Sequence, residues 1–375
     1  MKNILLTLLL FILFSCKSTG DKTDCEVLHV DLVERPVPME ELFSKISVIP
    51  LETNDSSFLV RPVKVIIKDN RYYIVDEGVP AVFSFDEEGH LLHKIGKKGQ
   101  GPGEYREVYD MIVDESKNQV RLLSPFGSLY TYDLEGNFIK QNQLPEKSNY
   151  QAMEQIGDNI MTWTIPVSSD EPCITIVNAD NGKEVSSLWK GPRILNSLSG
   201  GSFYTYDGKT YFAPAFHNNE ILEVTEDSLK LAYKWDFGKD NIDISKYNFT
   251  LTDDNQAEEG RLMTNYLENG TIPYLLGSQY QNSKYFYVCF SYGWFPNQTI
   301  KHLFYRKSDG KSFFFKDTQE NISIRPQAFE EECIVQFASY DDLEAYKSIL
   351  SPAEYQKIIS RNEEDNPCLI KLYFK

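Results

Sequence analysis

The stretch Phe83-Ser84-Phe85-Asp86-Glu87-Glu88-Gly89 decides the fold, because its pattern returns along the chain. It is a short run of strand-forming residues followed by a turn of acidic residues and glycine. Asp, Asn and Gly supply the positive-φ positions that tight hairpin turns need. The pattern returns, with substitutions, at Tyr130–Asn137, Ile174–Gly182, Ile221–Ser228 and Phe304–Gly310. The chain is therefore built from repeated β-hairpin units.

The spacing of these turns identifies the repeating unit. Gly89 and Gly136 lie 47 residues apart, Gly136 and Gly182 lie 46 apart, and Gly182 and Asp227 lie 45 apart. An insertion near residues 238–273 lengthens the last interval. A period of about 40–50 residues is typical of a four-stranded β-propeller blade. A β-sandwich would not keep this constant phase.

Each period divides into four short strands. The first unit has expected strands at Val63–Lys68, Tyr72–Asp76, Ala81–Phe85 and Leu91–Ile95, and the second at Asp110–Asp114, Gln119–Leu123, Ser128–Tyr132 and Phe138–Gln141. Five blades can be counted in this way, and a sixth is incomplete.

The sixth blade needs a strand from elsewhere in the chain. Glu332–Ala338 and Pro367–Phe374 supply its later strands, and a segment at about 341–359 between them has helical spacing, divided by Pro352. The strand-like run Ile46–Leu51 can supply the outer strand, which closes the ring and removes an exposed edge. The prediction is an all-β, six-bladed propeller closed between its N- and C-terminal segments.

The N-terminus resembles a bacterial lipoprotein signal peptide. Lys2 precedes an apolar run, Ile4–Phe14, and Ser15 precedes Cys16, the residue that would be lipidated. The apolar run is too short for a permanent transmembrane helix. A lipid bilayer is therefore an expected partner, through acylated Cys16. The expected organisation is a signal peptide at 1–15, a lipidated flexible tether at 16–41 and the propeller at 42–375.

Composition excludes some functions. The net charge of −17 argues against nucleic acid, whose phosphates need clustered Lys and Arg. The aromatic content of 13% favours pleated sheets. No Cys-x-x-Cys motif supports a zinc or thioredoxin-like site. The cysteines within or beside apolar runs are expected to be small buried hydrophobes: Cys173, Cys289, Cys333 and Cys368.

Four segments together resemble the six-bladed β-propeller lipoproteins of Bacteroidota, which are distantly similar to NHL-repeat propellers. These segments are Ile46–Leu51, Phe85–Gly89, Gly96–Tyr105 and Asn366–Ile370. The resemblance implies an outer-membrane lipoprotein, on the periplasmic or the surface face, associated with nutrient or glycan handling. The family carries no agreed catalytic residues, so none is transferred to this chain.

The glycine-rich segment Gly96–Tyr105 is not a phosphate-binding loop. It lacks the Gly-Lys-Ser/Thr ending of a P-loop and opens no helix. It is expected to carry the chain from the outer strand of blade one to the inner strand of blade two, with glycines at the backbone turns.

Aromatic loops supply the candidate ligand contacts. Propellers place inner-to-middle strand connections and blade-to-blade connections on one face, and aromatic rings beside Arg, Asn and Gln suit a sugar ring or a peptide. The candidates on that face are Trp294, Tyr292, Phe126, Tyr105, Arg106, Arg193 and His217. The alternative is that the aromatic loops form a hydrophobic support under the helical segment at 340–359.

A channel enzyme is the competing interpretation. Lactonase-type propellers hold a divalent metal with inner-strand carboxylates, and weak candidates here are Asp110, Asp114, Glu154 and Asp207. No cofactor is indicated, and no Ser-His-Asp motif is present. The sequence favours a non-enzymatic binding protein, with a glycan or an envelope protein as partner. A metal-dependent hydrolase or lyase, and a scaffold subunit acting through the insertion, are the alternatives.

Overall fold

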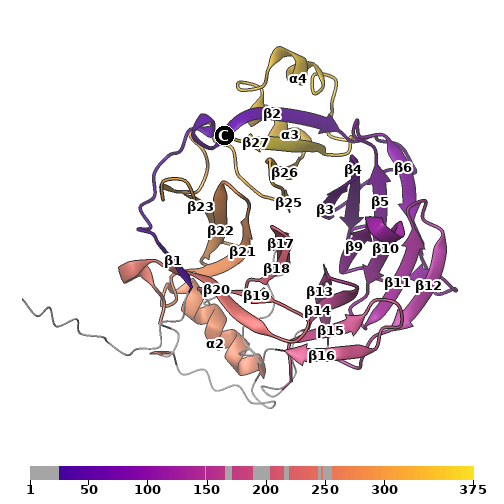
Figure 1. Ribbon diagram of the computed structural model, residues 1–375. Coiled ribbons are helices and arrows are strands. Elements are labelled where there is room, and N and C mark those ends of the chain that lie inside the picture. Colours follow the sequence, from indigo (N-terminus) through magenta and orange to yellow (C-terminus); the bar gives the residue numbers. More distant parts are fainter. Residues whose placement is uncertain are drawn as a thin grey trace, which may run out of the picture.

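The computed structural model is a six-bladed β-propeller, as the repeats predict (Figure 1). It describes residues 25–147, 149–164, 171–188, 203–214, 219–243, 246–247, 256–294 and 296–375. Six sheets are arranged radially around one axis, and the first strand of each repeat is innermost.

Blades one to three each consist of four consecutive antiparallel strands. Blade one is β3 (Pro62–Lys68), β4 (Arg71–Asp76), β5 (Ala81–Phe85) and β6 (Leu91–Ile95). Blade two is β9 (Asp110–Asp114), β10 (Gln119–Leu123), β11 (Ser128–Asp133) and β12 (Phe138–Gln143). Blade three is β13 (Tyr150–Ile156), β14 (Asn159–Thr164), β15 (Ile174–Asn178) and β16 (Glu184–Leu188). The predicted strands agree with these to within two residues at each end.

Blades four to six recruit the N-terminal segment. Blade four is β17 (Phe203–Tyr206), β18 (Lys209–Phe212), β19 (Glu220–Val224) and β20 (Leu229–Asp236), with β1 (Glu26–His29) as a fifth, parallel strand. Blade five is β21 (Leu275–Gln281), β22 (Tyr285–Tyr292), β23 (Thr299–Arg306) and β24 (Ser312–Phe315). Blade six is β25 (Ala328–Phe329), β26 (Cys333–Ala338), β27 (Cys368–Phe374) and β2 (Phe43–Pro50).

Ring closure occurs as predicted, between the two ends of the propeller. The outer strand β2 pairs antiparallel with β27, from Phe43 opposite Phe374 to Pro50 opposite Cys368. The exposed edge of β2 is then covered at Val48, whose N–H donates to Glu354 Oε2 at 2.6 Å and whose carbonyl accepts from Lys357 Nζ at 2.9 Å. Covering the edge in this way removes a template for unwanted strand pairing.

The predicted helical segment consists of two short helices on blade six. They are α3 (Tyr340–Tyr346) and α4 (Pro352–Gln356), and Ser339 and Ser351 each cap one by accepting a backbone N–H bond. Leu343, Tyr346 and Ile358 pack into the apolar cluster between blades five and six. None of the helices in the described part of the chain is long and apolar enough to cross a membrane.

Part of the segment predicted as a tether belongs to the folded propeller instead. Residues 26–42, which we call the arm, run along the outside of blades four, five and six (Figure 1). After β1, Glu34 forms a parallel bridge with Phe314 and Val37 with Thr318. The helix α1 (Met39–Leu42) then leads into β2. These residues are ordered because Leu28 and Val30 bury their side chains against blades four and five.

The insertion at 238–273 lies between blades four and five. It begins with the 3₁₀ turn η2 (Gly238–Asp240) and contains α2 (Gln256–Glu268). Met263 and Leu267 of α2 pack on Ile272 and Leu275 at the start of blade five.

The segment Gly96–Tyr105 connects blade one to blade two, as expected. It carries a small parallel pair, β7 (Lys97–Lys98) and β8 (Glu104–Tyr105). Gly103 has φ +71° and faces the Phe138 ring so closely that a Cβ would lie 2.4 Å from it. A glycine is therefore required there.

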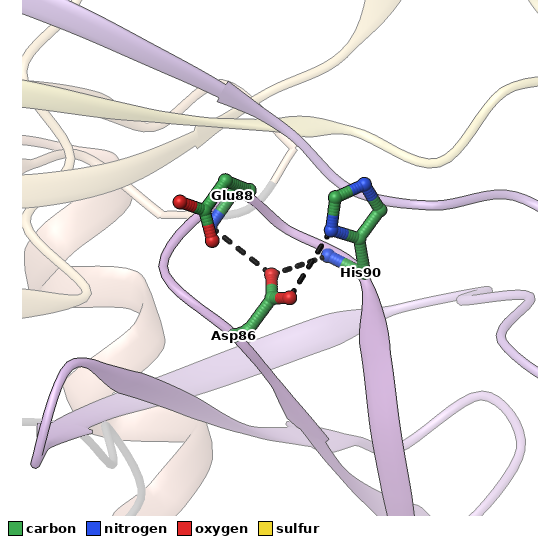
Figure 2. Close-up of side chains that lie close together, drawn as sticks. All are labelled: Asp86, Glu88 and His90. Atoms are coloured by element: carbon green, nitrogen blue, oxygen red, sulfur yellow. Dashed lines mark hydrogen bonds and ion pairs between the residues drawn. The ribbon is translucent and has the colours of Figure 1, made fainter.

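The turns of blades one and two share one hydrogen-bond pattern. Asp86 Oδ1 accepts from the N–H groups of Glu88 at 3.0 Å and His90 at 2.8 Å, and Oδ2 lies 3.1 Å from His90 Nδ1 (Figure 2). In blade two, Asp133 accepts in the same way from the N–H groups two and four residues later, and from the Asn137 amide. The aspartate therefore satisfies the turn backbone in both repeats.

A buried ion pair stabilises blade two. Arg121 and Asp114 are 0% and 8% exposed, and Arg121 Nη1 lies 2.9 Å from Asp114 Oδ2. Burial raises the pKa of Asp114, but hydrogen bonds from Ser116 and Arg121, together with the Arg121 charge, hold the pKa below its ordinary value. The carboxylate is thus ionised when it faces the guanidinium.

We expect Asp114→Ala to destabilise the protein by about 3–5 kcal/mol, because it leaves Arg121 buried without a counter-charge. Urea unfolding at neutral pH measures this loss. Since the folded pKa is depressed, the wild-type advantage is complete above about pH 4 and declines as the pH falls further. The control is Asp309→Ala, which breaks the exposed Arg306–Asp309 pair and should cost far less. Equal losses in the two variants would contradict the argument.

For the repeated turn, Asp86→Ala and Asp133→Ala should each cost about 1 kcal/mol, since each removes the same set of side-chain hydrogen bonds. Thermal unfolding, with and without a chelator, compares the two variants. If the loss of thermal stability relative to wild type depends on the chelator for Asp86→Ala but not for Asp133→Ala, Asp86 does more than hold the turn.

Candidate functional site

A cavity of about 300 Å³ lies where the arm, the insertion and blade five meet. We call it the insertion pocket. The arm contributes Leu32, blade five contributes Tyr292, and Pro273 and Tyr274 come from the junction between the insertion and β21. The remaining lining comes from the insertion: Lys239, Asp240, Asn241, Ile242, Asp243, Lys246 and Tyr247. Its volume is at the lower end of the range for small-molecule sites.

The pocket loop, residues 238–243, is held by the end of β20. Asp236 Oδ1 accepts from Gly238 N–H at 3.0 Å and from Asn241 Nδ2 at 2.6 Å. Asn241 Oδ1 in turn accepts from Phe237 N–H at 2.9 Å and from Asn219 Nδ2 at 3.0 Å. Hydrogen bonds from Asn241, the Gly238 amide and His29 lower the pKa of Asp236. An ionised carboxylate therefore organises the loop.

Tyrosines form the aromatic part of the pocket. The Tyr274 hydroxyl donates to the Asp240 carbonyl at 2.7 Å, and the Tyr274 ring centroid lies 5.8 Å from that of Tyr292. The Tyr247 hydroxyl donates to the Thr271 carbonyl at 2.9 Å. Burial raises the pKa of Tyr292 to about 12, and it raises that of Tyr274 as well. Both phenols stay neutral. Tyr292 is half-buried and can offer a ring face and a polar hydroxyl, whereas Tyr274 is buried and supports the wall behind it.

The charged side chains of the lining balance one another. The lining has two lysines, Lys239 and Lys246, and two aspartates, Asp240 and Asp243, and Lys246 Nζ lies 3.7 Å from Asp243 Oδ2. Because the charges of the described lining residues cancel and three phenols stand beside them, this lining is suited to a neutral ligand rich in hydroxyl groups.

Two predicted contacts come together near the insertion. Tyr292 lines the pocket. Trp294 follows it in the chain but is half-buried against Met263 and Leu267 of α2, and is not part of the pocket lining. The alternative that the helical segment at 340–359 rests on these loops is not met, because that segment packs on blade six.

The other described contacts lie elsewhere. Phe126 is 73% exposed in the β10–β11 turn, and Arg106 is exposed and donates to Gln100 Oε1 at 2.9 Å. The β10–β11 side of the ring is opposite β22 (Figure 1). Tyr105 is fully buried and its hydroxyl donates to the Ile95 carbonyl at 3.0 Å, so the prediction that it contacts ligand is corrected: it is a core residue. Arg193 and His217 lie outside the described residues.

The carboxylates proposed for a channel metal do not form one cluster. Asp110 is buried, ion-paired with Lys64, and accepts from the N–H groups of Met111 and Met153, each at 2.8 Å. Burial and the nearby Asp110 raise the pKa of Glu154, whereas Lys64 opposes them. Asp207 is exposed in the β17–β18 turn with φ +50°.

Asp114, the fourth carboxylate considered, is engaged by Arg121. Among the described residues, one group of three His, Cys, Asp or Glu side chains has ligand atoms within 4.8 Å of one another: Asp86, Glu88 and His90. The hydrogen bonds of the repeated turn account for this arrangement (Figure 2).

Sequence reasoning missed most of the pocket lining. The run 236–243 contains three Asp and one Asn beside Gly238, which is a recognisable turn signal. That signal interrupts the repeat, so the repeat pattern does not mark it as a site. Leu32 gave no signal, since it lies in a polar segment.

Comparison with known proteins supports the fold and gives no activity. No curated protein matches the chain. A protein of Bacteroides fragilis described as exported has a similar structure, with a TM-score of 0.73 and 15% identity, covering 93% of this chain and 99% of the other. A member of the DUF4221 family from Bacteroides vulgatus is similar with a TM-score of 0.55 and 12% identity, covering 89% of this chain and 97% of the other.

The family comparison covers almost the whole propeller. The model of a domain of unknown function, DUF4934, matches residues 26–373, and thus includes the arm and the closing strand β27. The chain therefore belongs to the DUF4934 family.

Proposed function

We propose that this protein is an exported, lipid-anchored binding protein that holds a neutral glycan in the insertion pocket. The observation that carries the proposal is the lining itself: three tyrosines, an anchored asparagine and a balanced set of charges in about 300 Å³. A sugar presents apolar ring faces and many hydroxyl groups, and both find partners in such a lining.

The location is argued from the N-terminus. The motif around Cys16 resembles a lipidation site, and Cys25 begins the described chain nine residues later. Even fully extended, those residues reach about 30 Å. A lipid on Cys16 would therefore keep the propeller close to the outer membrane. The similar fold of an exported Bacteroides protein is consistent with this placement.

A channel enzyme has less support. A metal site needs free carboxylate oxygens, and both oxygens of Asp110 already accept hydrogen bonds. Glu154 lies near the Lys64 charge. A scaffold role through the insertion would be indicated instead if no small ligand binds.

The test is a thermal-shift screen of the full chain in detergent. The probes are maltotriose, cellotriose and xylotriose, with trigalacturonate as an anionic comparison and Ca²⁺ with and without chelator. A ligand that binds only the folded state raises the melting temperature. We expect a shift with a neutral trisaccharide that chelation does not change. No shift with any sugar would overturn the proposal, and a chelator-sensitive shift would favour the channel enzyme.

For the bound trisaccharide, we expect Tyr292→Ala to raise the Kd about 2- to 12-fold, because it removes a ring worth about 0.5–1.5 kcal/mol. Calorimetric titration measures the change. The matched control is Phe126→Ala, which removes an exposed ring on the opposite side of the propeller and should leave the Kd unchanged. A higher Kd in Phe126→Ala alone would indicate that the ligand binds at blade two instead.

A further inference from the structure

The arm passes directly beside the insertion pocket. Leu32 lines the cavity and packs on the apolar cluster between blades four and five. It is preceded by β1, which pairs with β20, and followed by Glu34, which bridges to blade five. A pocket wall is therefore supplied by the segment nearest to Cys16.

Asp236 fastens the arm and the pocket loop at the same point. Its Oδ2 lies 2.8 Å from His29 Nδ1, at the end of β1, and its carbonyl accepts from Val30 N–H at 2.9 Å. Its Oδ1 holds Gly238 and Asn241 of the pocket loop. One carboxylate oxygen of Asp236 thus contacts the arm, and the other holds the pocket loop.

Lys301 makes a second connection between the arm and the pocket. Its Nζ lies 2.7 Å from Glu34 Oε2 of the arm and 4.4 Å from the centre of the Tyr292 ring. Glu34 positions the lysine, and the lysine covers one face of a pocket tyrosine. Loss of the arm would therefore disturb both the loop and the aromatic wall.

We propose that the arm is a working wall of the ligand site, and that arm docking and the order of the pocket loop form one cooperative unit. The Leu32 side chain limits the size of the ligand that the pocket accepts, and a bound ligand stabilises the docked arm. Such coupling is reciprocal, so undocking the arm weakens the ligand by the same factor. The ligand part rests on the proposed function; the coupling between arm and loop does not.

The first experiment needs no ligand. Hydrogen exchange of the full chain in detergent is compared between wild type and the double variant His29→Ala/Glu34→Gln, which changes only the arm. We expect exchange to accelerate about 3- to 10-fold over residues 26–37 and also over 238–243, where the Asp240 and Asn241 N–H groups bond to Phe237 and Gly238. The control is Glu41→Gln, which breaks the exposed Glu41–Lys311 pair in α1 and should leave 238–243 unchanged.

Faster exchange in the arm without any change at 238–243 would overturn the coupling. Unchanged exchange in the arm would also overturn the proposal, because the His29 and Glu34 contacts would then not hold the arm in place. Strands β9 and β10 of blade two serve as the internal reference, and faster exchange there would mean general unfolding and would also count against the proposal.

The second experiment uses the neutral trisaccharide with the largest shift in the screen. At 100 times its Kd it should slow exchange in residues 26–37, and Leu32→Trp should raise its Kd at least tenfold while the ligand-free melting temperature stays close to wild type. Binding that leaves the arm and Leu32→Trp unaffected would refute the arm as a wall and leave the proposed function intact. If no sugar binds, the proposed function fails and the exchange comparison still decides the coupling.

Discussion

Burial of apolar surface between neighbouring blades is the constraint on which the rest of the structure depends. Each sheet has two apolar faces and can bury neither alone. Six separate apolar clusters lie between successive blades, including one between the last blade and the first. The ring must therefore close, and β2 beside β27 is the strand pair that closes it. The course of the arm, which leads into β2, and the covered edge at Val48 both follow from that closure.

Much of this fold was predictable because residues close together in the sequence define the repeat. Asp86 and Asp133 occupy equivalent turns, and each satisfies the backbone through the same hydrogen bonds. Turn residues and short apolar runs act over a few positions, so one sequence displays them directly. The closing strand was also predictable, because the incomplete sixth repeat requires one.

The arm and the pocket were not predictable in the same way. Glu26–His29 is only four residues long, and its strand depends on the edge of β20, more than 200 residues later. The prediction that Tyr105 contacts ligand is wrong because a residue in a loop can still bury its side chain between two blades. Its hydroxyl bonds to Ile95 and its ring packs between blades one and two, so the Gly-Pro-Gly-Glu-Tyr run is a signature of fold. Tyr292, which the sequence predicts as a ligand contact, lines the insertion pocket; aromatic residues at strand ends stand out in a sequence.

The repeats determine the fold of the family, whereas the proposed binding site belongs to the insertion and the arm. Charged side chains of neighbouring inner strands pair with one another, as Lys64 and Asp110 do. The insertion and the arm interrupt the repeat, and they carry the balanced lining of the pocket. The proposed binding site therefore lies in the segments where the sequence departs from its own period.

The position of β2 also has a consequence for biogenesis. Phe43 pairs with Phe374, so its partner is made 331 residues later. A chain that is still being synthesised has its blade faces and its arm without the strand that completes the ring. Pairing of such distant segments is intrinsically slow. The unfinished chain thus exposes its blade faces until its last strand has been made, and a product that lacks β27 also lacks the strand with which β2 pairs.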